Sequence, residues 1–232
     1  GEVVFVYEFY ASDTGMIIVK QPDSVTNNTH KYGLWDGTST PTVNTDAGST
    51  NVYGEAAWLE SAAHPNLYEF VTLHLQNSTT STSADLYAFF TNSSDSICLG
   101  KVEDNVDCLY QPFDVAYEQL SGDVLMAYAY YTDSQIRYRK FERNAGISSE
   151  DTYDPSLGSG AVRWMKCFPK PDSNEIAVAY STAGRDLVVV IWDGTSFNAS
   201  TKKLVTGDLY STEDRCWDMC YEQGGDRDLV LA

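Results

Sequence analysis

Two glutamates that recur in equivalent surroundings have the clearest capacity for chemistry in this sequence. Glu118 and Glu222 each stand in a Tyr-Glu-Gln tripeptide, and each has an aspartate four residues earlier, Asp114 and Asp218. Two carboxylates at a suitable separation are what a glycoside hydrolase uses as acid and as nucleophile or base. A repeat, however, copies its hydrogen-bonding residues together with its core, whereas active sites use residues that differ between copies. We therefore expect these carboxylates to be structural, and we assign no catalytic residue.

The other reactive groups lack the spacing that chemistry requires. His30, His64 and His74 form no spaced metal-binding or catalytic motif, so we expect exposed or packing histidines, and a metal or catalytic pair of His64 and His74 is the alternative. The Gly-x-Ser-x-Gly elbow of acyl-transfer enzymes is absent. The acidic segments 103–107 and 226–228 offer oxygen ligands to Ca²⁺, but without the spacing of a calcium-binding loop. No cofactor is expected, and calcium is left as the alternative.

Composition restricts the kinds of partner. Fifteen basic and 33 acidic residues give a formal charge of -18, which repels nucleic acid and anionic lipid. No apolar run approaches the roughly 18 residues that a membrane-spanning helix needs. Tyr10, Tyr130, Tyr131 and Tyr138 could offer an aromatic surface to a sugar, although cross-strand packing explains them equally well. The expected partner is a protein, a second copy or a glycan.

Acceptor sequences for N-glycans point to an extracellular or cell-surface location. Asn-x-Ser/Thr triplets in loop-like, Ser/Thr-rich segments begin at Asn27, Asn77, Asn92 and Asn198. Such triplets also arise by chance in a chain rich in serine and threonine, and this alternative stays open.

The five cysteines are compatible with the same location. Cys98 and Cys108 bracket a short acidic segment that we interpret as a loop, so they are candidates for a local disulfide, and no Cys-x-x-Cys pair indicates zinc or redox chemistry. Cys167 and Cys220 fall at equivalent places and are expected to be small buried thiols. The pairing of Cys167, Cys216 and Cys220 is left open.

A repeat of about fifty-two residues defines the elements that must position these groups. The pentapeptide W-D-G-T-S at Trp35 recurs at Trp192, 157 positions later, and the Tyr-Glu-Gln at Tyr117 recurs 104 positions later. Aromatic first strands begin at Trp58, Phe113, Trp164 and Trp217. Second strands are predicted at 69–75, 123–130, 175–180 and 228–231, and third strands at 85–90, 136–141 and 186–192. A two-residue hairpin at Asp193-Gly194 leads into a fourth strand.

Four short antiparallel strands in each unit predict a β-propeller blade. Abundant valine, threonine and tyrosine also favour an all-β chain. We expect one β-propeller-type repeat domain, residues 1–232, with units 1–57 (partial), 58–112, 113–163, 164–216 and 217–232 (partial). Because residues 1–10 align with residues 122–131, the array is expected to open at a second strand and to be cut within a blade at both ends. The chain is then part of a longer array or of an assembly.

The repeat resembles secreted tandem-repeat β-propeller proteins of the sialidase-like or BNR-like kind, whose blades carry W-D-G-T-S hairpins like those at Trp35 and Trp192. No segment fits the Ser-x-Asp-x-Gly-x-x-Trp box of sialidases, so their catalytic residues have no counterpart here. The sequence thus favours a non-enzymatic extracellular scaffold that binds protein or glycan. Two alternatives stay open: a glycoside hydrolase or lyase on a propeller, and a filament subunit completed by a neighbouring chain.

Overall fold

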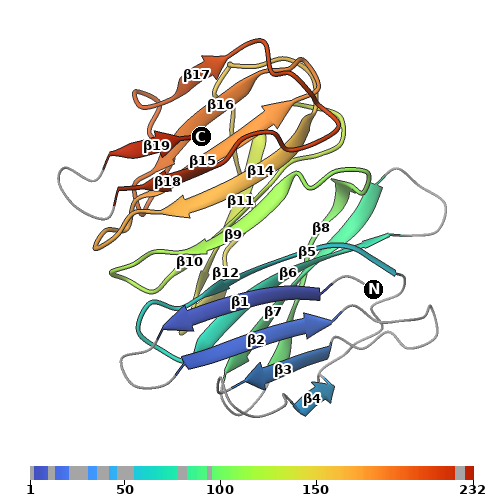
Figure 1. Ribbon diagram of the computed structural model, residues 1–232, viewed down its shortest axis with the longest axis vertical. Helices are drawn as coiled ribbons and strands as arrows, with labels where there is room; N and C mark the ends of the chain where they lie inside the picture. Colours follow the sequence, from blue (N-terminus) through green and yellow to red (C-terminus); the bar gives the residue numbers. More distant parts are fainter. Residues whose placement is uncertain are drawn as a thin grey trace. The chain divides into compact units, whose positions relative to one another are not determined.

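The computed structural model describes residues 3–9, 14–20, 31–35, 42–45, 55–77, 83–92, 96–222 and 228–232 (Figure 1). All elements in these ranges are β-strands, and they pair into sheets. No helix in the same ranges has the length and apolar character needed to cross a membrane. The predicted all-β class is confirmed.

Contacts divide the chain into two compact units, Gly1–Leu109 and Tyr110–Ala232. The first unit holds two four-stranded sheets in sequence order. One consists of β1 (Val3–Phe9), β2 (Thr14–Lys20), β3 (Lys31–Trp35) and β4 (Thr42–Thr45), and the other of β5 (Glu55–Ala63), β6 (Glu69–Asn77), β7 (Ser83–Asn92) and β8 (Ser96–Asp107).

The second unit continues the same pattern. Its first sheet consists of β9 (Phe113–Tyr117), β10 (Val124–Tyr128), β11 (Ile136–Glu142), β12 (Gly146–Ile147) and β13 (Asp151–Tyr153), where both β12 and β13 pair with β11. The next consists of β14 (Val162–Pro169), β15 (Ile176–Thr182), β16 (Leu187–Trp192) and β17 (Lys203–Thr206), and β18 (Met219–Tyr221) pairs with β19 (Leu229–Leu231). The predicted blade of four antiparallel strands is confirmed.

The N-terminal sheet corrects the expected phase of the repeat. Trp35 ends β3 opposite Met16 of β2, just as Trp192 ends β16 opposite Ile176 of β15. β3 is therefore a third strand, and β1 is a first strand rather than the expected second strand. The alignment of residues 1–10 was wrong because apolar strand sequences resemble one another, whereas the pentapeptide at Trp35 marks one place in the blade.

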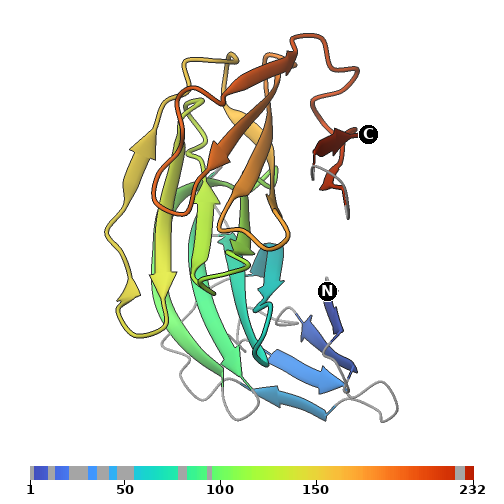
Figure 2. The same cartoon turned by 90° about the vertical axis from the view of Figure 1, so that its left-hand side faces the viewer.

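Strand β15 shows why the central strands are apolar throughout. Side chains alternate between the two faces of a strand, so Val178 packs in one cluster with Leu125 of β10, whereas Ala177 packs in another with Trp217. In Figure 2 the short red pair β18–β19 lies beside the orange strands of the neighbouring sheet, in line with the contact between β14 and β18. A sheet covered on both faces has no need of a polar face.

The turn after β16 is longer than expected. Trp192 pairs with Phe197, so four residues rather than two connect the strands. Asp193 Oδ1 accepts hydrogen bonds from the backbone N–H groups of Thr195 and Ser196 at 2.9 Å each, and this side-chain bonding organises the longer loop. Gly194 has a φ of 96°, and a Cβ there would lie 2.8 Å from the Cβ of Asn174. Glycine is therefore required for both conformation and space.

Candidate functional site

Glu118 follows β9, and its side chain connects this blade to the next one through Trp192 at the end of β16. Its Oε1 accepts a hydrogen bond from the indole Nε1–H of Trp192 at 2.8 Å, and its Oε2 accepts one from the hydroxyl of Ser121 at 2.5 Å. The side chain is 1% exposed. Burial raises the pKa of Glu118, and the hydrogen bonds from Ser121 and Trp192 oppose that rise.

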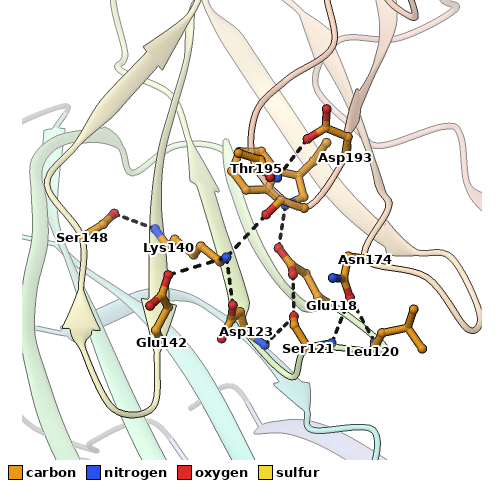
Figure 3. A network of polar contacts seen from close by, with 12 residues as sticks. Glu118, Leu120, Ser121, Asp123, Lys140, Glu142, Ser148, Asn174, Asp193 and Thr195 are labelled. Atoms are coloured by element: carbon orange, nitrogen blue, oxygen red, sulfur yellow. Dashed lines mark hydrogen bonds and ion pairs between the residues drawn. The ribbon is translucent and has the colours of Figure 1, made fainter.

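A wider polar network surrounds this contact (Figure 3). The Lys140 ammonium lies 2.8 Å from Asp123 and 3.7 Å from Glu142, and it donates to the carbonyl of Gly194 at 3.4 Å. The side-chain oxygen of Asn174 accepts the backbone N–H groups of Leu120 and Ser121 at 3.2 and 2.9 Å. The turns of two consecutive blades are thus bonded to each other, and Glu118 holds them together.

The repeated carboxylates differ in burial between the two copies of the repeat. Asp114 is 4% exposed, accepts the backbone N–H of Cys167 at 2.7 Å and lies 3.9 Å from the Lys166 ammonium. Glu222 and Asp218, at the same places of a later unit, are exposed. The carboxylates that the sequence singled out thus have separate neighbours, and no group of three or more His, Cys, Asp or Glu side chains in the described ranges could hold a metal ion.

The prediction of a loop between Cys98 and Cys108 is wrong, because this segment is a β-strand. Residues 96–107 form the single strand β8, in which Cys98 lies opposite Phe89 and the residue before Cys108 lies opposite Ser83. Six positions along a strand span about 20 Å, whereas a disulfide requires Cα atoms within about 7 Å of each other. This geometry does not fit a disulfide between Cys98 and Cys108, and it places the acidic segment 103–107 on a strand.

The remaining thiols are placed unequally. Cys167 is buried, as expected of a small core thiol, but Cys220 is exposed, so that part of the expectation is wrong. Strand β18 explains the difference, because its buried, exposed, buried pattern turns Met219 and Tyr221 inward and Cys220 outward. Cys216 is also exposed.

The histidines and tyrosines that the sequence singled out do not come together in one site within the described residues. His64 is half-buried and accepts the backbone N–H groups of Asn66 and Leu67 through Nδ1, whereas His74 is 1% exposed in β6. Tyr138 packs against Trp192 and Phe197 rather than forming an open surface. His30, Tyr10 and residues 226 and 227 lie outside the described residues.

The four acceptor asparagines differ in setting. Asn77 and Asn92 end strands β6 and β7, and Asn27 lies outside the described residues. Asn198 lies in the turn after β16, where its Oδ1 accepts the Ser200 hydroxyl at 2.7 Å and the Ser200 backbone N–H at 3.0 Å. The acceptor and its hydroxyl are therefore already in contact in a turn.

We expect Asn198 to carry an N-glycan when the chain is produced with a secretion signal in a eukaryotic host, because it lies with Ser200 in a surface turn. Intact mass before and after enzymatic deglycosylation measures this. Asn198→Gln and Ser200→Ala should each remove one glycan mass, whereas Ser196→Ala in the same turn should not. An unmodified Asn198 in the secreted parent protein would contradict the prediction.

A partly exposed cluster of aromatic and charged side chains lies where the connections before β9 and before β18 meet the beginning of β14, within the second unit. We call Tyr110, Arg163, Trp164, Thr212 and Glu213 the Arg163 cluster. Arg163 Nη1 donates to Glu213 Oε1 and to the Thr212 hydroxyl, both at 2.6 Å. Tyr110 donates its hydroxyl to Glu213 Oε2 at 2.9 Å, and the Trp164 indole N–H donates to the Thr212 carbonyl at 3.4 Å.

The rings and charges of the Arg163 cluster are close-packed yet reachable from solvent. The Arg163 guanidinium lies 4.4 Å from the centre of the Tyr110 ring, and the Tyr110 and Trp164 rings meet edge to face at 6.1 Å. The Glu213 side chain is 69% exposed. Hydrogen bonds from Tyr110 and then Arg163 lower the pKa of Glu213, so that it is a carboxylate at neutral pH.

Sequence reasoning missed this cluster. Tyr110 and Glu213 are 103 positions apart and Arg163 lies between them, so no local motif joins the three residues. The available signal was positional: Tyr110 and Glu213 precede the aromatic first strands at Phe113 and Trp217 by three and four residues. Neighbouring repeats contact one another, and here the connections before β9 and before β18 both reach Arg163 at the beginning of β14.

Solved structures match the fold, although no protein-family model and no curated protein sequence matches the chain. A mutant of the Aleuria aurantia lectin in complex with alpha-methyl-L-fucoside matches with a TM-score of 0.61 at 12% identity, over 99% of this chain and 69% of that chain. Another structure of this lectin, described as a six-bladed β-propeller with a novel fucose recognition mode, matches with a TM-score of 0.59 at 10% identity, over 99% and 69%.

A mutant of AofleA from Arthrobotrys oligospora matches with a TM-score of 0.56 at 8% identity, over 99% of this chain and 64% of that chain. Identities this low show the fold alone. The β-propeller architecture that the repeat and the resemblance predicted is therefore confirmed: this chain is built from the blades of a β-propeller.

Proposed function

We propose that this chain is a non-catalytic, carbohydrate-binding β-propeller protein and that the Arg163 cluster contacts the sugar. The observation that carries the proposal is the solvent-reachable Glu213 carboxylate held by Arg163 and Tyr110 beside two aromatic rings. An extracellular or cell-surface location belongs to the same proposal and rests on the acceptor sequences. Protein partners remain compatible with it.

The chemistry of the cluster suits a sugar. The C–H face of a pyranose packs on an aromatic ring, and such rings supply apolar contact area at a small entropic cost. Neighbouring hydroxyls of the sugar can donate to Glu213 and accept from Arg163, and hydrogen bonds to charged groups are the stronger kind. Since Arg163 and Tyr110 already orient the carboxylate, little ordering is needed on binding.

The matched lectins supply the first ligand to test. One of these lectin structures is a complex with alpha-methyl-L-fucoside, and another was solved with a novel fucose recognition mode, so methyl α-L-fucoside is the first probe. Neutral methyl glycosides of galactose, mannose and glucose follow it. The chain's charge of -18 favours neutral over anionic sugars.

Isothermal titration calorimetry with these glycosides tests the proposal. Glu213→Gln and Arg163→Ala should each weaken binding at least about tenfold, because each removes a charged partner of the sugar hydroxyls and hydrogen bonds to charged groups are the stronger kind. The matched control is Arg143→Ala, which removes an exposed arginine from the turn after β11 and should stay within twofold of the parent protein. Binding of no glycoside, or binding that both variants leave unchanged, would overturn the proposal.

A further inference from the structure

A pocket lies between the first strand of one blade, β14, and the first strand of the next, β18. A cavity of ≈ 180 Å³, which we call the Tyr221 pocket, is lined by Phe168, Pro169, Pro171, Cys220 and Tyr221. It is smaller than the roughly 300 Å³ at which pockets for drug-sized ligands begin. Its size is that of a site for one small ring.

Polar groups stand beside this apolar lining. Glu175 Oε1 accepts the Tyr221 hydroxyl at 2.9 Å and the Lys170 ammonium at 3.2 Å, and that ammonium lies 5.7 Å from the centre of the Tyr221 ring. Burial and the bond to Glu175 raise the pKa of Tyr221, so its hydroxyl stays protonated as a donor. The Lys170 and Glu175 side chains are 28% and 31% exposed, which leaves both open to solvent.

We propose that the Tyr221 pocket binds one neutral pyranose ring, with the ring's C–H face on Phe168 and Tyr221 and its hydroxyls on Glu175 and Lys170. Aromatic and proline rings provide the apolar surface that a sugar's C–H face contacts. The Lys170–Glu175 pair provides one donor and one acceptor and has no net charge, so it does not compensate an anionic sugar in a chain of charge -18.

The inference rests on the proposed carbohydrate-binding function but concerns different residues from the Arg163 cluster. The Tyr221 pocket lies at the end of β14, by the turn that contains Pro171 and Glu175. Arg163 lies at the beginning of the same strand. The two sites can therefore be tested separately.

Cys220 makes binding in the pocket measurable, because it lines the pocket and is exposed. The protein is alkylated with iodoacetamide, with and without methyl α-L-fucoside or the methyl glycosides of galactose and mannose, and tandem mass spectrometry follows each thiol. A bound glycoside should slow alkylation of Cys220 at least threefold. Cys216, which is exposed but does not line the pocket, is the internal control and should react at an unchanged rate.

Variants separate the two sites. Glu175→Gln and Lys170→Gln should each abolish the protection of Cys220, while Glu213→Gln should leave it intact. Melting curves show that each variant is folded. If calorimetry detects an Arg163-dependent glycoside but Cys220 is never protected, the pocket inference fails and the proposed function stands. If no glycoside binds anywhere, both fail. Protection by a proline-rich peptide and by no sugar overturns the inference in favour of a peptide site.

Discussion

Trp192→Ala is expected to lower the free energy of unfolding by about 3–5 kcal/mol, the range for removing a fully buried tryptophan. Trp192 is 2% exposed and belongs to the cluster that packs β10 against β15. The substitution leaves a cavity and also removes the N–H that Glu118 accepts at 2.8 Å. Urea denaturation followed by circular dichroism measures the change.

A double-mutant cycle isolates the hydrogen bond from the packing. Glu118→Ala should cost about 1–3 kcal/mol, because it leaves the buried indole N–H without its acceptor. The double variant should be less destabilised than the sum of the single ones, since neighbouring residues couple by about 0.5–3 kcal/mol. Glu222→Ala is the control: it removes the equivalent but exposed glutamate and should stay within about 0.5 kcal/mol of the parent protein. If the losses of the two single variants simply added up in the double variant, the hydrogen bond between Trp192 and Glu118 would be contradicted.

Glu118→Gln should show how pH acts on this contact. The pKa of Glu118 is raised in the folded protein, mainly by burial, so the folded state disfavours its ionised form. Glu118 therefore favours folding most below its unfolded pKa, and this contribution is lost as pH rises toward the folded pKa. The stability of Glu118→Gln relative to the parent should accordingly rise between pH 4 and pH 7. A difference that stays constant over this range would contradict the raised pKa.

The strands and their order in a blade were predictable because they depend on local patterns. β10, β15 and β16 are apolar on both faces, and sheets that cover both faces of a strand produce this pattern in any repeat. The recurrence of Trp35 and Trp192 identified the third strand of a blade, and both end such a strand in the structure. Residues 1–10, which were expected to be a second strand, were assigned to the wrong place in the blade.

Strand β8 was missed for a physical reason. It is the outermost strand of its sheet, so charged and polar side chains such as Lys101, Asp104 and Asn105 face solvent, and only Val102 and Val106 of the segment are well buried apolar residues. Its pairing with β7 is also irregular at several positions. Charges and bulges are what protect an edge strand from unwanted pairing, and in sequence they look like a loop.

The candidate sites were beyond the reach of the sequence because their residues come from different blades. Arg163 and Glu213 are 50 positions apart, and Tyr221 and Glu175 are 46 apart. Neither pair forms a local sequence motif. Each pair meets only because a connection or a turn packs against the next blade. The repeated carboxylates had the opposite character: Glu118 and Asp114 were visible in sequence, and each bonds to a neighbouring blade.

Asp114→Ala is expected to destabilise the protein by about 1.5–3 kcal/mol, the range for hydrogen bonds to charged groups. The Asp114 carboxylate is 4% exposed, accepts the backbone N–H of Cys167 at 2.7 Å and lies 3.9 Å from the Lys166 ammonium. Removing it leaves a buried N–H without this acceptor and a mostly buried ammonium without this neighbouring charge. Urea denaturation again provides the measurement.

Asp114→Asn distinguishes the two contributions, because its amide oxygen can still accept the Cys167 N–H while its charge is lost. If the hydrogen bond to the next blade dominates, Asp114→Asn should retain more than half of the stability that Asp114→Ala loses. Asp218→Ala is the matched control, since Asp218 occupies the equivalent position, is exposed, and bonds to the backbone N–H of its own neighbour Met219 at 3.0 Å. Its substitution should change stability by less than about 0.5 kcal/mol. An equal loss at Asp114 and Asp218 would mean that burial between blades does not decide the role of this repeated aspartate.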